Sequence, residues 1–191
     1  MAEWLNDMTG LALQLVAEVG DVIRRVKPGE VEQLAEAIIR CRRLFLDGRG
    51  RSGLMMRAFA IRLTHLDIHC HVVGESTTPA LRSGDLLLVG SGSGETITPL
   101  LAAQAAKKAG GTMAVLTARP QSAMAQLADL TVVIPAPVRE ENAAETAQTI
   151  QPMGSLFEQA LLILLDTIVL LLKARLQRDE KMMMARHTNL E

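Results

Sequence analysis

Two glycine-rich turns hold the residue types in this 191-residue chain that could do chemistry on a small ligand. The first, GRGRSG over residues 48–53, has the glycine spacing of a dinucleotide-binding fingerprint. The second, GSGSGET over residues 90–96, places glycines beside the hydroxyl groups of Ser91, Ser93 and Thr96. Glycines let backbone N–H groups approach an anion closely, and hydroxyl groups add hydrogen bonds. The second turn is therefore a candidate phosphate cradle that lacks the lysine of a P-loop.

Short apolar runs surround both turns and predict the strands that must position them. They recur along the chain at residues 44–46, 68–73, 86–89, 113–116 and 130–134. Helices are predicted between most of them, at residues 52–65, 96–109 and 121–127, whereas residues 77–83 form no more than a turn. Five apolar strands that alternate with helices predict a parallel sheet covered on both faces. The expected fold is α/β, a three-layer α-β-α sandwich with the flavodoxin-like strand order 2-1-3-4-5.

The two turns follow strands one and three of this sheet, and its switch point lies between those strands. For either turn alone, the simpler interpretation is a strand-to-helix connection in which Ser93 caps a helix. Their coincidence at a switch point instead indicates one shared anion site. A dinucleotide enzyme would use the first turn and an acid after strand two, for which Glu75 is the candidate. It would not need the hydroxyl groups of the second turn, so a small phosphorylated ligand fits better.

Glu158 is the carboxylate best placed to act as a general base. It stands three residues after Ser155 at the expected start of a helix, where the helix dipole favours a negative charge. The same spacing is that of a capping box, which explains Glu158 without any chemistry. Position in the sequence leaves both interpretations open.

The four histidines give weaker signals. His187 lies in a terminal segment that frays by default, and it matters only if that segment docks. His65 is expected on a helix surface. His69 and His71 flank Cys70, but no third ligand follows at a spacing typical of zinc, so no metal site is predicted.

Long helices frame the predicted sheet. Two helices with an apolar stripe are expected as a hairpin within residues 3–42, before a sheet-containing core at 43–135. A polar stretch at 136–152 is interpreted as a lid or an oligomer contact, and 153–191 as a C-terminal helix and tail. That helix, at about 156–176, is apolar nearly all round, which predicts an oligomer. No linker or repeat divides the chain, so a single domain over 1–191 is expected.

Composition excludes several classes of protein. The formal net charge of −1 and the aromatic content of 2% argue against a nucleic-acid partner. Two cysteines cannot form a disulfide framework, and the start of the chain lacks the profile of a secretory signal. The most apolar stretch, residues 160–172, is shorter than the roughly 20 residues needed to span a membrane. A cytoplasmic protein without a membrane partner is expected.

With these elements in place, the chain resembles the sugar isomerase (SIS) fold, and within it the 6-phospho-3-hexuloisomerase family. The resemblance runs nearly end to end. It is carried by GRGRSG at 48–53, VGE at 73–75, GSGSGET at 90–96, QPMGSLFEQ at 151–159 and the RHTNLE tail at 186–191. It implies interconversion of D-arabino-hex-3-ulose 6-phosphate and fructose 6-phosphate in the ribulose monophosphate pathway of formaldehyde fixation. It also implies a homotetramer with no metal or nucleotide cofactor.

The resemblance also implies roles for individual residues. Glu158 would be the base, and His187 would enter the site from a neighbouring subunit. The substrate and its phosphate would be bound by residues of the two turns: Gly50, Arg51, Ser52, Ser91, Gly92, Ser93, Gly94, Glu95 and Thr96. Two alternatives of the same fold stay open, an isomerase for another sugar phosphate such as arabinose 5-phosphate and a non-catalytic module that senses sugar phosphates. On the residues alone, the dinucleotide-dependent dehydrogenase remains a third.

Overall fold

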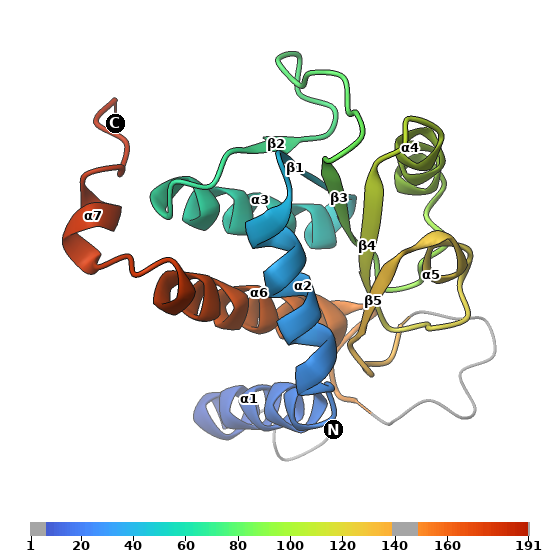
Figure 1. The fold of residues 1–191 in the computed structure, drawn as a ribbon. Coiled ribbons are helices and arrows are strands. Elements are labelled where there is room, and N and C mark those ends of the chain that lie inside the picture. Colours follow the sequence, from blue (N-terminus) through green and yellow to red (C-terminus); the bar gives the residue numbers. More distant parts are fainter. Residues whose placement is uncertain (1–6, 139–148, 191) are drawn as a thin grey trace.

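The computed structural model describes residues 7–138 and 149–190, and its centre is a five-stranded parallel sheet (Figure 1). The strands are β1 (Leu44–Gly48), β2 (Cys70–Val72), β3 (Leu86–Gly90), β4 (Thr112–Thr117) and β5 (Leu130–Val133). They lie in the order β2-β1-β3-β4-β5, so the predicted order is confirmed. All five predicted strands are present, although β2 is shorter than the apolar run that predicted it.

Helices cover both faces of the sheet, which confirms the three-layer sandwich. One face carries α2 (Pro28–Arg40), α3 (Gly50–His65) and α6 (Ser155–Arg175), and the other carries α4 (Ile97–Lys108) and α5 (Ala123–Leu127) (Figure 1). Alternate strand residues divide between two cores: Leu44 and Leu46 pack with the helices of the first face, and Phe45 packs with α4. Because the central strands β1, β3 and β4 are buried on both faces, they are apolar without alternation.

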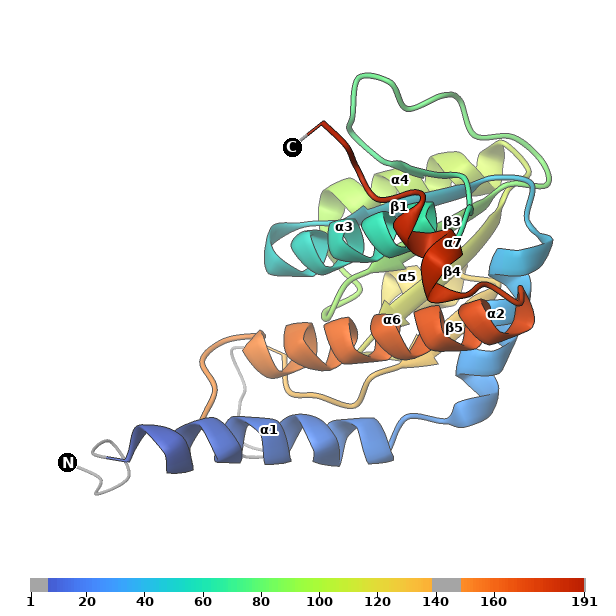
Figure 2. The same cartoon turned by 90° about the vertical axis from the view of Figure 1, so that its left-hand side faces the viewer.

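The two N-terminal helices are present but diverge instead of packing along each other. α1 (Met8–Arg24) begins at Asp7, whose carboxylate accepts a hydrogen bond from the Gly10 N–H at 2.9 Å. It lies along α6, outside the sandwich, whereas α2 turns away toward β5 (Figure 2). Pro28 stands at the first position of α2, where the backbone N–H would have no partner within the helix. This proline therefore starts α2 as well as ending the preceding helical pattern.

α6 is the longest helix described, with 21 residues. Its length and its mean hydropathy of 2.0 would suit a membrane span, but half of that window is buried inside the protein, as in the core helix of a soluble protein. The helices α1, α2 and α3 pack around it. Ile163 and Leu170 nevertheless stay 47% and 65% exposed, so one chain does not cover the helix completely.

The segment that leads into α6 is tied to α1. The Glu18 carboxylate accepts hydrogen bonds from the Thr149 hydroxyl, the Ile150 N–H and the Gln151 side-chain amide at 2.6, 3.1 and 3.1 Å. Burial alone would raise the pKa of Glu18, but these three donors together lower it. Most of the predicted lid or contact loop at 136–152 lies outside the described residues, since 139–148 are not among them.

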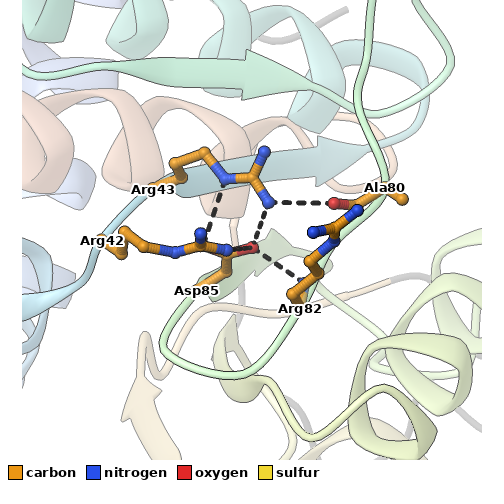
Figure 3. A network of polar contacts seen from close by, with 5 residues as sticks. All are labelled: Arg42, Arg43, Ala80, Arg82 and Asp85. Atoms are coloured by element: carbon orange, nitrogen blue, oxygen red, sulfur yellow. Dashed lines mark hydrogen bonds and ion pairs between the residues drawn. The ribbon is translucent and has the colours of Figure 1, made fainter.

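A buried carboxylate fixes the amino end of β3, at the edge of the sheet opposite the two glycine-rich turns. Asp85 has a fully buried side chain and pairs with Arg42 and Arg43 at 3.2 and 2.6 Å (Figure 3). It also accepts a hydrogen bond from the Arg82 N–H at 2.8 Å, while Arg43 reaches the Ala80 carbonyl. These contacts join the start of β1 to the loop that precedes β3.

Candidate active site

The two glycine-rich turns meet at the carboxyl edge of β1 and β3. Gly48 and Gly90 are register partners at the ends of these paired strands. A Cβ atom on Gly48 would lie 3.1 Å from the Gly90 carbonyl oxygen, and one on Gly53 would lie 2.6 Å from the Gly48 carbonyl oxygen. Only glycine allows the backbone to approach so closely. The first turn is open to solvent at Gly50 and Arg51, so packed side chains do not close this edge.

The second turn is organised by its own hydroxyl groups. Ser91 is buried, and its Oγ lies 3.3 Å from Thr96 Oγ1 and accepts a hydrogen bond from the Gly94 N–H at 3.2 Å. Ser93 Oγ accepts from the Glu95 N–H at 3.2 Å. The N-cap residue of α4 is Thr96, so the alternative in which Ser93 caps this helix is wrong. Within the described chain, the N–H groups of Gly92 and Ser93 find no acceptor.

Glu95 stands apart from these hydroxyl groups. Its carboxylate accepts a hydrogen bond from the Ala123 N–H at 2.7 Å, at the start of α5. Gly94 on the same turn has φ +65° and packs against Ser122. A Cβ added to Gly94 would lie 2.5 Å from the Cβ of Ser122. The second turn therefore packs against the N-terminus of α5 through Glu95 and Gly94.

α3 starts two residues earlier than predicted, at Gly50 with φ +56°. Arg51 and Ser52 are consequently in its first turn, where unpaired N–H groups and the helix dipole favour an anion. Ser52 is half-buried and Arg51 is exposed. The hydroxyl of Ser52 and the N-terminus of α3 thus lie at the same edge of the sheet as the second turn.

Glu158 is brought to this edge by the first turn of α6. The N-cap of α6 is Gly154 and no side chain caps it, so the capping-box interpretation of Ser155 and Glu158 is wrong. Instead, Glu158 Oε2 accepts a hydrogen bond from Arg51 Nε. Its neighbour Phe157 packs under the second turn, because a Cβ on Gly92 would lie 3.1 Å from the Phe157 ring. The carboxylate therefore contacts the first turn, while Phe157 of the same helix turn contacts the second, and the side chain of Glu158 is 16% exposed.

His187 of the same chain lies far from Glu158. Its ring stacks on His65 with centroids 5.3 Å apart, and His65 is buried, so the prediction of a surface position for His65 is wrong. Burial, with Arg62 and His187 nearby, lowers the pKa of His65. His65 is the last residue of α3 and Arg51 lies in its first turn, which separates their backbones by about 21 Å at 1.5 Å per residue. The terminal segment is held there by α7 (Glu180–Met184) and by Arg186, which pairs with Asp67 at 2.8 Å.

The family model of the SIS domain matches residues 37–163 of this chain. The chain belongs to the SIS domain family. The match starts in α2 and ends in α6, and so includes all five strands, both glycine-rich turns and Glu158.

The relatives of this SIS domain extend over nearly its whole length. A 3-hexulose-6-phosphate isomerase of Bacillus subtilis is 39% identical over 96% of this chain and 98% of its own. One of Mycobacterium gastri is 40% identical over 97% of this chain and 92% of its own. These relatives confirm the resemblance to the hexuloisomerase family. A solved structure from Methanococcus jannaschii, whose molecular function was inferred as 3-hexulose-6-phosphate isomerase, has a TM-score of 0.82 at 30% identity over 95% of this chain and 99% of its own.

Other candidate residues of the SIS domain have structural partners. His71 packs on Phe45 with ring centroids 5.2 Å apart, and among the described residues no three His, Cys, Asp or Glu side chains gather as a metal site. Glu75, the acid of the dinucleotide interpretation, pairs with Arg57 at 2.6 Å.

Proposed function

We propose that this chain is an isomerase that interconverts D-arabino-hex-3-ulose 6-phosphate and D-fructose 6-phosphate. Two relatives named 3-hexulose-6-phosphate isomerase, 39% and 40% identical over nearly the full chain, support this substrate pair. The observation that carries the proposal is the convergence of two glycine-rich turns and the carboxylate of Glu158. This arrangement supplies a phosphate site and a base at one edge of the sheet.

The phosphate is bound by the second turn and by the start of α3. Ser91, Ser93 and Thr96 offer hydroxyl groups, and the N–H groups of Gly92 and Ser93, which have no acceptor among the described residues, are available to the ligand. Ser52, with the backbone of Gly50, contributes from the first turn. Arg51 adds positive charge beside Glu158.

Glu158 moves one proton between adjacent carbons of the sugar. Its carboxylate removes the proton from C2 of the 3-ketose, and the electrons of that bond form a C2–C3 double bond, which gives an enediol. The same carboxyl group returns a proton to C3, and O2 loses its proton as the C2 carbonyl forms. O3 gains a proton when the enediol forms, and O2 loses one when the C2 carbonyl forms. Donating and accepting these protons is the role proposed for His187. The electrons stay within the sugar, so the reaction needs no redox cofactor.

We further propose that the site is shared between subunits of a homotetramer in the cytoplasm. His187 stacks on His65, which lies about 21 Å along α3 from Arg51, the residue that contacts Glu158, so a neighbouring chain would supply the histidine of this site. Exposed apolar side chains on α1 and α6, including Val16, Ile163 and Leu170, provide a surface for such contacts.

The test is a coupled assay with the purified chain. Hexulose 6-phosphate, formed in place from ribulose 5-phosphate and formaldehyde by a synthase, is converted to fructose 6-phosphate and detected by a dehydrogenase. We expect turnover of this substrate and none of arabinose 5-phosphate. Turnover of the pentose phosphate alone would contradict the proposed substrate. Binding of sugar phosphates without turnover of either would indicate a sensing module.

A further inference from the structure

Asp47 is a buried charge at the carboxyl end of β1 with no role in the site described so far. Its side chain is 0% exposed. Oδ1 accepts a hydrogen bond from the Gly48 N–H at 2.7 Å, while no described residue donates to Oδ2, which is also buried. Burial raises the pKa of Asp47, against the opposing effects of the Gly48 N–H and of Arg49.

A carboxylate in this position is unfavourable for the fold alone. A buried oxygen without a hydrogen-bond donor loses its hydration, and no hydrogen bond within the protein compensates for the cost in free energy. An uncharged residue of similar size would not carry this cost. Such groups concentrate at functional sites, where a charged partner has to be held in place. The partner of Asp47 is Arg49.

Arg49 lies beside this carboxylate, one residue after the end of β1. Its Nη1 lies 3.0 Å from Asp47 Oδ1 and 3.4 Å from the Gly48 carbonyl oxygen. Among the described residues, none accepts a hydrogen bond from its Nε or Nη2. The side chain is 39% exposed. The guanidinium group is thus anchored at one end and presents further donors to solvent.

The strand register places Arg49 on the side of the second turn. The register of β1 and β3 ends with Gly48 and Gly90, and the backbone of Arg49 is still extended, with φ −124° and ψ 159°. Continuing the ladder by one residue would bring Arg49 beside Ser91, at the usual strand spacing of about 4.8 Å. Side chains alternate along a strand, so Asp47 points to the face that Phe45 shares with Val89, and α4 covers that face. The first turn of α4 closes the second turn at Thr96, on this same face.

We propose that Arg49, held by the buried carboxylate of Asp47, is a ligand of the substrate phosphate. Arg49 binds the phosphate oxygens that the hydroxyl groups of the second turn leave open, and Asp47 is a positioning residue that acts through it. This inference rests on the proposed function for its substrate. A guanidinium group suits the role because its planar donors pair with two oxyanions of a phosphate at once.

The first experiment compares Arg49→Met with Arg40→Met. Arg49→Met should raise KM for hexulose 6-phosphate about 10- to 100-fold, the loss expected for one charged hydrogen bond, with kcat changed far less. The inhibition constant for inorganic phosphate should rise by a similar factor. Arg40→Met removes an exposed cation that pairs with Glu36 at the other edge of the sheet, and it should change neither value. An unchanged KM and phosphate affinity in Arg49→Met would overturn the proposal.

The second experiment separates positioning from a structural role. Asp47→Asn keeps the size of the side chain and an acceptor for the Gly48 N–H, but it removes the charge that holds Arg49. We expect a raised KM with a Tm no lower than that of the unchanged protein, because a desolvated charge is lost. A lowered Tm with an unchanged KM would show that the pair serves the fold alone. If the unchanged protein does not turn over the hexulose phosphate, the proposed function fails. Calorimetric binding of inorganic phosphate to the same variants then still tests Arg49.

Discussion

Arg51 Nε donates a hydrogen bond to Oε2 of Glu158, a contact between residues 107 positions apart in the sequence. It joins the first turn of α3 to the first turn of α6, and the second glycine-rich turn packs on Phe157 beside it. The base proposed for the reaction is therefore oriented by a residue at the edge proposed to bind the phosphate. Removing the charge of Glu158 tests the proposed mechanism most directly.

Glu158→Gln should abolish turnover and leave fructose 6-phosphate bound. The amide oxygen still accepts the hydrogen bond from Arg51 Nε, so the site keeps its shape, but an amide cannot take a proton from carbon. We expect kcat to fall by about 100- to 10,000-fold, the usual contribution of a general base. Affinity for fructose 6-phosphate, measured by calorimetry, should stay close to that of the unchanged protein.

The control for this variant is Glu32→Gln, which neutralises an exposed carboxylate on α2. It should retain full turnover. If Glu158→Gln were as active as this control, Glu158 would not be the base, and another group at the edge of β1 and β3 would have to move the proton.

Gly94→Ala and Gly50→Ala should differ because only one of the two glycines lacks space. Both have left-handed backbone, with φ +65° and +56°, so each substitution should cost about 1–2 kcal/mol of unfolding free energy. A Cβ on Gly50 meets nothing within 4 Å, whereas one on Gly94 would lie 2.5 Å from Ser122 Cβ. Gly94→Ala should therefore also displace the second turn and lose phosphate affinity. Urea unfolding and phosphate binding measure the two effects separately, and equal behaviour of the variants would contradict this reasoning.

The sheet was predictable because its central strands β1, β3 and β4 are buried on both faces. Each buried strand reads as a short apolar run, and glycine-rich turns mark where β1 and β3 end, so strand count and order follow from local patterns. Helix starts were less accessible: α3 begins at Gly50, inside the turn that the glycine spacing defines. The path of α1 along α6 depends on packing between distant segments, which an amphipathic stripe does not specify.

The two turns of the candidate site could be predicted from the sequence, but the long-range contacts of its residues could not. The hydroxyl groups of Ser91 and Thr96 were apparent from the motif, but the contact between Arg51 and Glu158 spans most of the chain. A local rule favoured Ser155 as the partner of Glu158, and the long-range contact replaced it. His65 looked like a surface residue because His187, which stacks on it, lies at the other end of the sequence. The unpaired oxygen of Asp47 had no signal in the sequence beyond an acid directly after an apolar run.

Asp85→Asn should destabilise the protein and reduce the dependence of its stability on pH. The hydrogen bond from Arg43 is the largest of several effects that together hold the pKa of Asp85 below its value in the unfolded chain. A lowered pKa in the folded state means that the ion pair stabilises the protein fully above about pH 4. This stabilisation is lost as the pH falls further and the carboxylate is protonated. We expect the variant to lose about 3 kcal/mol of unfolding free energy at pH 7, by analogy with other broken buried ion pairs, and to lose little more in acid.

Asp21→Asn provides the matched comparison, since Asp21 pairs with Arg24 on the surface of α1 with 68% of its side chain exposed. Exposed pairs contribute roughly 0–1 kcal/mol, so this variant should keep the stability of the unchanged protein at every pH. Urea unfolding between pH 3 and 7 compares the two variants. If the Asp85 variant were as stable as the Asp21 variant at pH 7, the ion pairs of Asp85 with Arg42 and Arg43 would not contribute to the free energy of unfolding.

Mixing two inactive variants should restore activity if the site is built from two chains. Glu158→Gln lacks the proposed base, and His187→Ala lacks the proposed donor, so each homomer is expected to be inactive. In mixed oligomers with equal amounts of both chains, about a quarter of the sites would combine an intact Glu158 with an intact His187 from the neighbour, because the pairings are random. The mixture, prepared by co-expression, should therefore recover about a quarter of the activity per site. If both residues acted within one chain, every site would keep one defect and the mixture would stay inactive. The stacking of His187 on His65, at the far end of α3 from Arg51, favours recovery.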